Sequence, residues 1–115
     1  MINLSEFFFS ELDEHKKVLN STKDNIEMQF IELVNCCKKS IEGGGKLIFF
    51  GNGGSAADAQ HLSTELTVKF SKERKPIPAI ALTTDTSALT AIGNDLGFEK
   101  IFSRQIDALG NSNDI

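Results

Sequence analysis

The sequence predicts an α/β fold, a doubly wound parallel sheet preceded by N-terminal helices. Two short and continuous apolar runs, residues 46–50 and 79–82, have the pattern of strands buried on both faces of a parallel sheet. Each run is followed by a turn and then by apolar residues at helical spacing, which is the alternation typical of such a sheet. Before the first run, residues 4–42 show helical spacing alone.

The composition is that of an ordinary globular protein, and it argues against two classes of partner. The chain has 115 residues, of which 40% are hydrophobic and 24% charged, and its net charge is −4. This charge argues against a nucleic-acid partner, because clustered positive charge supplies most of the affinity for phosphate backbones. No apolar run approaches the roughly 20 residues that cross a bilayer, so we expect no membrane partner.

Two features predict a cytoplasmic protein. The N-terminus has neither the basic nor the apolar segment of a signal peptide. Cys36 and Cys37 are adjacent in an apolar setting, so we expect two reduced thiols rather than a disulfide.

Two helices are predicted in the N-terminal part. The first covers residues 4–20, with Ser5 as its N-cap, and its apolar residues lie on more than one side. Such a helix usually meets several neighbours, which points to packing against another subunit. The second covers residues 23–42 and carries one apolar face, made of Ile26, Phe30, Leu33, Val34, Cys37 and Ile41. We therefore expect residues 1–42 to form helices that pack in an oligomer, and residues 43–115 to form the first, incomplete part of an α/β domain.

The α/β part is expected to alternate regularly. A glycine-rich turn follows the first strand, and Leu62, Leu66 and Phe70 are the expected buried stripe of the helix after it. The expected helices cover residues 55–70, 86–92 and 98–109, with a break at 93–95. Two strands are fewer than a stable sheet needs, and Ile115 stands where a third would begin. We expect the sequence to be truncated before that third strand.

The first candidate site is the turn Gly51-Asn52-Gly53-Gly54-Ser55. In such sheets ligands bind beyond the carboxyl ends of the strands, where glycines allow close approach and a helix N-terminus offers free N–H groups. The alternative is an ordinary turn, which also favours Gly and Ser. The letters fit the dinucleotide fingerprint as well, but Asp85 lies further along the chain than its acidic residue should.

The second candidate site is the pair His61 and Glu65, which share one helix face at spacing i, i+4. This spacing can present an imidazole and a carboxylate to one metal ion, with Asp58 one turn earlier as a supporting partner. The alternative is a solvated face, with Glu65 paired to Lys69.

The third candidate site consists of polar residues after the second strand, Thr84 and Asp85, together with the segment Gly93-Asn94-Asp95. Asp85 has the position of an N-cap for the helix that follows. Asn94 and Asp95 are expected in a loop beside Gly93 and Gly97, where their side chains could face a ligand. The alternative is a polar turn without function.

Short motifs lie along residues 43–115 in a characteristic order. They are Gly51–Ser55, Ala59–His61, Glu65–Leu66, Ala91–Asp95 with Gly97–Phe98, and Phe102–Arg104. In order and spacing they resemble the sedoheptulose-7-phosphate isomerases (phosphoheptose isomerases), a family of the sugar-isomerase (SIS) fold. The resemblance implies a flavodoxin-like, three-layer α/β domain.

The resemblance also implies an activity. The family consists of cytoplasmic homotetramers that convert sedoheptulose 7-phosphate to D-glycero-D-manno-heptose 7-phosphate through an enediol, for lipopolysaccharide or capsule. By this likeness Glu65 is the catalytic base, and His61 and Glu65 bind one zinc ion per site, with its other ligands beyond residue 115. The implied substrate contacts are Asn52, Gly53, Gly54, Ser55, Glu65, Asn94 and Asp95.

The chain departs from the family at one motif and lacks others. Where the family carries Gly-Arg, this chain has Val68-Lys69, and lysine keeps the charge but loses the planar fork. The family's Ser/Thr-rich phosphate loop and late Gln and His are absent from the 115 residues. We therefore expect the chain alone to be inactive and to bind zinc weakly.

Two other functions stay open. A non-catalytic SIS module could bind a protein, as relatives that bind the bacterial replication initiator do, or a domain of this fold could sense sugar phosphates. The pair His61 and Glu65 favours the enzyme, because neither alternative needs it.

Overall fold

The computed structural model describes residues 3–115, which divide into two compact units. One unit reaches to Asn35 and the other spans Cys36–Ile115. Helix α2, Glu27–Glu42, crosses this division. The domain boundary expected after residue 42 stays a prediction.

The first unit begins with helix α1, Leu4–Asn25, which is longer than predicted. Its N-cap is Asn3, whose side chain accepts hydrogen bonds from the N–H groups of Ser5 and Glu6, so the assignment of Ser5 as N-cap was wrong. The start predicted for the second helix, at residue 23, was also wrong. The segment around it holds no Gly or Pro, and helical hydrogen bonding continues until Ile26 donates to the carbonyl of Thr22.

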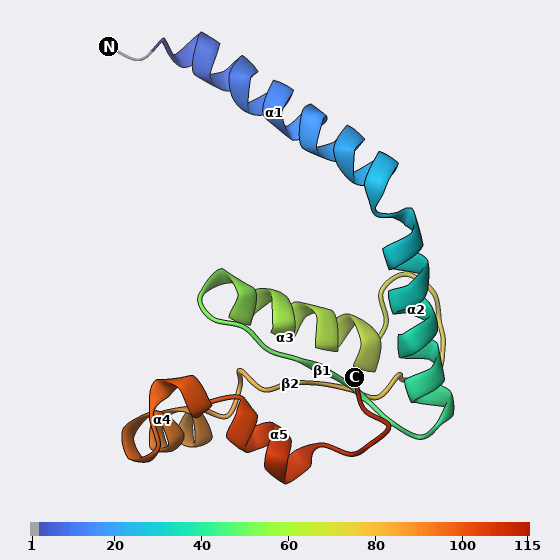
Figure 1. Ribbon diagram of the computed structural model, residues 1–115, viewed down its shortest axis with the longest axis vertical. Coiled ribbons are helices and arrows are strands. Elements are labelled where there is room, and N and C mark those ends of the chain that lie inside the picture. The colour runs from blue at the N-terminus through green and yellow to red at the C-terminus, as the bar shows by residue number, and fades with distance from the viewer. Residues whose placement is uncertain (1–2) are drawn as a thin grey trace. The chain divides into compact units, whose positions relative to one another are not determined.

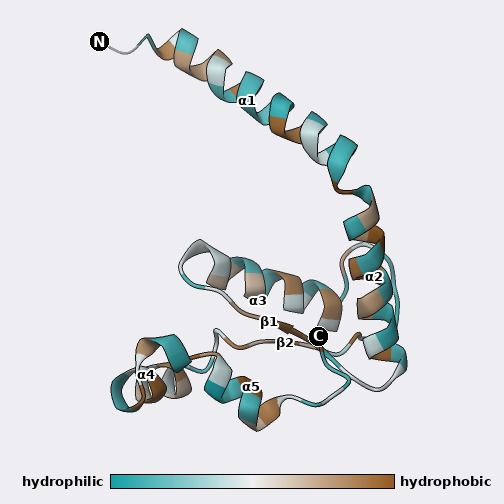
Figure 2. Cartoon of the chain, in the orientation of Figure 1, coloured by the Kyte–Doolittle hydropathy of each residue, from teal (hydrophilic) through white to brown (hydrophobic). Residues whose placement is uncertain are grey.

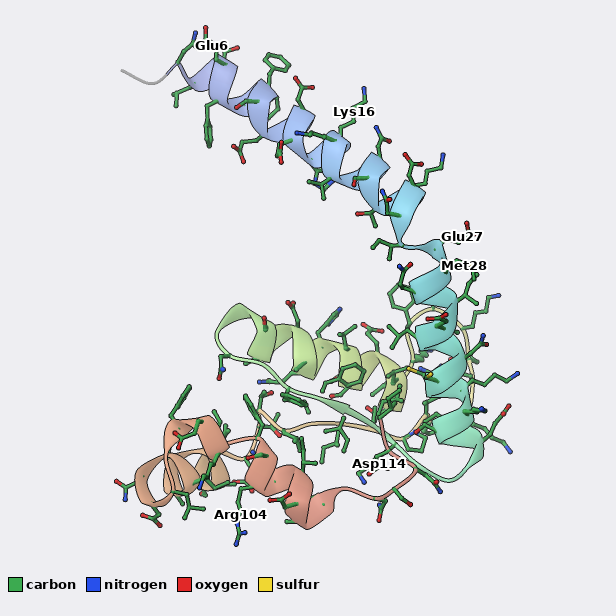
Figure 3. The ribbon with its side chains drawn as sticks, in the orientation of Figure 1. Glu6, Lys16, Glu27, Met28, Arg104 and Asp114 are labelled. Atoms are coloured by element: carbon green, nitrogen blue, oxygen red, sulfur yellow. The ribbon has the colours of Figure 1, made fainter. Side chains whose placement is uncertain are left out.

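Side chains of α1 are open to solvent all round within the described chain. None of its residues is buried, and Figure 3 shows Glu6 and Lys16 projecting freely from it. Hydrophobic and hydrophilic residues alternate along the helix (Figure 2). Its apolar residues Phe8, Leu12 and Leu19 are each more than half exposed.

The second unit contains the parallel sheet that the sequence predicts. Strands β1, Leu47–Phe49, and β2, Ala79–Ala81, pair in parallel with Leu47 opposite Ala79. Helix α3, Gly54–Thr67, connects them. Figure 1 shows α3 on one side of the two strands and α5, Ser103–Leu109, on the other. The helix expected over residues 98–109 is thus interrupted, since a 3₁₀ turn at Phe98–Lys100 precedes α5.

The other edge of β1 is bonded to Ile115. Ile115 donates to the carbonyl of Lys46 and accepts from the N–H of Ile48, which is the pattern of parallel strands. β1 therefore lies between β2 and the segment that ends at Ile115.

Asp114 holds the segment before Ile115 against the start of β1. Its carboxylate accepts hydrogen bonds from the N–H and the ammonium group of Lys46 and from the N–H of Asn111, and its side chain is only 5% exposed. Figure 3 labels Asp114 in the C-terminal segment. Lys46 also donates to the carbonyl of Leu109, so one charged pair connects β1 with the chain after α5.

The core of this unit is small and formed between α3, the sheet and α5. Its buried apolar residues are Leu47, Ala59, Ala81, Leu82 and Ile101. The stripe predicted for α3 was wrong for two of its three residues: Leu62 is 49% exposed, and Phe70, which lies beyond the end of the helix at Thr67, is 79% exposed. Leu66 is half-buried, and the residue of α3 that is buried is Ala59, 4% exposed. Small side chains allow close approach of a helix to a sheet, and the larger ones remain outside.

A buried glutamine joins α5 to the sheet. The side-chain amide of Gln105 donates to the carbonyls of Leu82, just after β2, and Ile101, before α5.

In the described residues, no helix combines the length and hydrophobicity that a bilayer crossing needs. Cys36 and Cys37 are both free thiols.

Candidate functional site

The glycine-rich turn lies at the carboxyl end of β1, as predicted. A Cβ atom on Gly51 would come within 2.6 Å of the Cβ of Ser55, so the close approach of the turn to α3 requires glycine there. Gly53 has a φ of 59° and a ψ of −124°, a backbone conformation that side chains disfavour.

The turn leaves backbone donors free at the start of α3. Gly53 is the N-cap and has no side-chain cap, and the N–H groups of Gly53 and Gly54 have no acceptor among the described residues. Ser55 lies inside α3 and donates its N–H to the carbonyl of Asn52. These donors are suited to the oxygens of an anionic ligand.

A cavity of about 430 Å³ opens beside this turn. It is bounded by the turn after β1, the first turn of α3, the segment after β2, α4 (Thr86–Asp95) and the 3₁₀ turn with the two residues before α5. Asn52, Gly53, Thr83 and Thr90 contribute polar atoms, and the remaining wall is mainly apolar, with Leu89, Phe98, Ile101 and Phe102. Thr83 was not predicted as a site residue, although its place two residues after β2, at the carboxyl end of the strand, was a usable signal.

The pair His61 and Glu65 is brought together as predicted. The imidazole Nε2 and the carboxylate Oε1 are 3.7 Å apart, and the side chains are 71% and 28% exposed. These are a nitrogen and an oxygen of the types that zinc binds, within reach of one ion. The described residues contain no third histidine, cysteine or carboxylate grouped with them, so they fit as two ligands of a four-coordinate site.

The glycine turn and this pair occupy different parts of α3. At 1.5 Å per residue, Glu65 stands about 16 Å along the helix from Gly54. His61 and Glu65 do not line the cavity beside the turn.

Asn94 and Asp95 were wrongly predicted in a loop. They are the last two residues of α4, and the side-chain amide of Asn94 donates to the carboxylate of Asp95 over 2.7 Å. Gly93 does not break the helix; a Cβ there would meet Ile101 at 3.8 Å, so it lies at a packing contact. Gly97, with a φ of 104°, stands just after the helix.

The remaining polar candidate, Asp85, has the local role predicted for it. It is the N-cap of α4 and accepts the N–H of Ala88 over 2.9 Å. Neither Asp85 nor the pair Asn94 and Asp95 lines the cavity, although Gly93 does.

Known proteins resemble the chain over nearly its whole length. The phosphoheptose isomerase of Campylobacter jejuni is 53% identical over 118 residues, covering 100% of this chain and 60% of the relative. That of Paramagnetospirillum magneticum is 48% identical, covering 99% and 59%. The structure of phosphoheptose isomerase from Neisseria gonorrhoeae matches with a TM-score of 0.89 at 38% identity, covering 97% of this chain and 58% of its own.

The chain thus spans about three fifths of the length of the relatives it matches. A family model described as the SIS domain matches residues 12–115, which include both strands, the glycine turn and the His61–Glu65 pair. This match, together with the parallel sheet and the free N–H groups of the glycine-rich turn after β1, shows that the chain belongs to the SIS domain family.

Proposed function

We propose that the protein is a phosphoheptose isomerase, an aldose–ketose isomerase that converts sedoheptulose 7-phosphate to D-glycero-D-manno-heptose 7-phosphate. The observation that carries the proposal is the His61–Glu65 pair, 3.7 Å apart on α3, in a chain whose relatives bear that name. A protein-binding or sensing domain would have no use for this pair.

Glu65 is the base in the proposed reaction. Its carboxylate takes a proton from the hydroxyl-bearing carbon next to the carbonyl group, and the electron pair of that C–H bond forms the enediol double bond while the carbonyl π electrons move to the carbonyl oxygen, which takes up a proton from water. The proton held by Glu65 then returns to the former carbonyl carbon, and the hydroxyl group on the first carbon gives its proton to water and becomes the new carbonyl group. A carboxylate that is 28% exposed can still accept a proton from a bound substrate.

The other candidate residues bind the substrate in this proposal. The free N–H groups of Gly53 and Gly54, with Asn52 and Ser55, contact the sugar phosphate from the start of α3. Asn94 and Asp95 contact sugar hydroxyls from the end of α4.

His61 and Glu65 would hold a zinc ion, one per site. When bound, zinc supplies a Lewis acid that stabilises negative charge on an oxygen. The remaining ligands would come from the part of the relatives that this chain does not cover, so the 115 residues alone should bind zinc weakly and show no turnover.

The assembly and setting of the enzyme complete the proposal. The exposed apolar residues of α1 support packing in a homotetramer. We place the enzyme in the cytoplasm, where it would supply heptose for lipopolysaccharide or capsule.

The test replaces Glu65 by Gln in the protein expressed from the longest reading frame that contains this sequence. Conversion of sedoheptulose 7-phosphate is followed by NMR in heavy water, where transfer through an enediol incorporates deuterium beside the carbonyl. We expect Glu65→Gln to lower turnover about 10²- to 10⁴-fold. The control Glu42→Gln, at the exposed end of α2, should leave turnover unchanged.

Two outcomes would contradict the proposal. A parent protein without turnover would remove the isomerase assignment. A Glu65→Gln variant as fast as the parent would remove Glu65 as the base.

A further inference from the structure

The last turn of α3 holds the proposed base and needs outside donors. Glu65 lies two residues before the end of the helix at Thr67. Carbonyl groups in the last turn of a helix have no N–H partner within it, and unpartnered ends fray. Val68 donates to the carbonyl of Thr64, which leaves the carbonyls of Glu65 and Leu66 to find donors elsewhere.

Arg74 supplies those donors. One guanidinium nitrogen, Nη1, donates to the carbonyl of Leu66 over 2.8 Å, and the other, Nη2, donates to the carbonyl of Glu65. Nη1 also donates to the carbonyl of Lys75 over 3.0 Å, which fixes the side chain to its own loop. The planar fork of arginine allows two neighbouring carbonyls to be bound together, which lysine cannot do.

The loop around Arg74 is attached to the same helix end at two more points. Ile77 donates its N–H to the carbonyl of Leu66 over 3.0 Å. Lys69, just after α3, is paired with Glu73. This exposed pair adds little stability by itself, but it shows that the ammonium group of Lys69 is engaged by the loop.

These contacts place a fixed cation at the main chain of the residue that performs the proposed proton transfer. We propose that Arg74 is a positioning residue for Glu65: its fork holds the last turn of α3 and thereby sets where the Glu65 carboxylate stands. The proposal rests on the proposed function of Glu65. Misplacing a reacting group by about 1 Å can lower the reaction rate about 100-fold. Fraying of the helix turn that carries Glu65 would therefore slow the proton transfer.

The role predicts a selective kinetic defect. Arg74→Ala should lower kcat about 10- to 100-fold and leave KM nearly unchanged, because the proposed phosphate donors lie at the opposite end of α3. Arg74→Lys, which keeps charge and stem but not the fork, should show the same defect more weakly. Added guanidinium ion should restore part of the kcat of Arg74→Ala, and sodium chloride at equal ionic strength should not.

A measurement without substrate tests the geometry separately. Amide hydrogen exchange of Thr67, Val68 and Ile77, followed by NMR in the protein expressed from the longest reading frame, should become about tenfold faster in Arg74→Ala. The control is Lys72→Ala in the same loop, an exposed residue whose side chain forms no hydrogen bond or ion pair within the described residues; it should change neither exchange nor kcat.

The outcomes separate this inference from the proposed function. A parent protein without turnover removes the isomerase assignment, and the exchange data then decide the structural role of Arg74 alone. Unchanged exchange in Arg74→Ala, or a parental kcat in Arg74→Lys and Arg74→Ala, overturns the inference. If Arg74→Ala does not fold, a parental kcat in Arg74→Lys overturns it.

Discussion

Asp114 shows how one carboxylate can fix two distant parts of a chain. The ammonium group of Lys46, which donates a hydrogen bond to it, lowers its pKa below the ordinary value of 3.8, and the N–H groups of Asn111 and Lys46 act in the same direction. Desolvation opposes them, but the donors prevail. The folded chain therefore stabilises the ionised form of the Asp114 carboxyl group.

This lowered pKa predicts a loss of stability in acid. Because the pKa is lower in the folded chain than in the unfolded chain, the contribution of Asp114 is complete above the unfolded value and is lost as pH falls through the folded value. Urea unfolding of the chain over a series of acidic pH values should show this decline. In Asp114→Asn the chain should be less stable near neutral pH and the decline should be shallower.

The matched control for this experiment is Asp107→Asn, an exposed carboxylate on α5. Its free energy of unfolding near neutral pH should equal that of the parent, and it should fall in acid by the same amount. If Asp114→Asn retains the full decline, other carboxylates cause it.

Among the elements, the start of α3 depends on two adjacent glycines in different ways. Gly53 adopts a positive φ before the helix, whereas Gly54 is the first helical residue and a Cβ on it would meet nothing within 4 Å. Only the first of them is required by the backbone.

We predict opposite effects of the same substitution at these neighbours. Gly53→Ala should lower the free energy of unfolding by about 1–3 kcal/mol, because it forces a side chain into a strained conformation. Gly54→Ala should be neutral or raise it by up to about 1 kcal/mol, because alanine loses less conformational entropy than glycine when its backbone becomes helical. Chemical denaturation of both variants provides the measurement, and equal losses would show that strain at Gly53 is not the cause.

The order and type of the helices and strands could be predicted from the sequence more accurately than the side of each helix that is buried. The order of helices and strands follows from local patterns, and the parallel pairing of β1 and β2 was confirmed. The buried side of α3 was missed because Ala59, rather than the larger Leu62, meets the sheet. Asn94 and Asp95 were misplaced because Gly93 was interpreted as a helix breaker, although it lies at a packing contact with Ile101.

The candidate site could be predicted only in part for a related reason. His61 and Glu65 are joined by helix periodicity, a local property, and their proximity was confirmed. Arg74 and Asp114 carry no motif, and their partners lie 9 and 68 positions away. Contacts of that kind depend on how the elements pack, which a single sequence does not reveal.

At the scale of the whole molecule, the exposed apolar surface of the first unit is the main feature to explain. Leu4, Phe8, Leu12 and Leu19 share one side of α1 at helical spacing, and each is at least half exposed. Apolar stripes of this kind mark interfaces, in line with the homotetramer proposed above.

This assembly predicts that charge on the stripe will dissociate it. In the longest form that the reading frame encodes, Phe8→Glu should shift the mass measured by light scattering from that of a tetramer to smaller species. The control Ser10→Glu adds the same charge on the opposite side of α1 and should leave the mass unchanged. A parental mass for Phe8→Glu would exclude the stripe as the contact.

The bonding of Ile115 to β1 also has a consequence for synthesis. Lys46 and Asp114 are 68 positions apart, so at roughly 5–20 residues per second the ribosome leaves one edge of β1 uncovered for about 3 to 14 s. During that time β1 is an unpaired strand edge, the kind of surface on which nascent chains aggregate. Strand β1 is only three residues long, Leu47–Phe49. This short length limits the number of backbone hydrogen bonds that another chain could form with the exposed edge before Ile115 pairs with it.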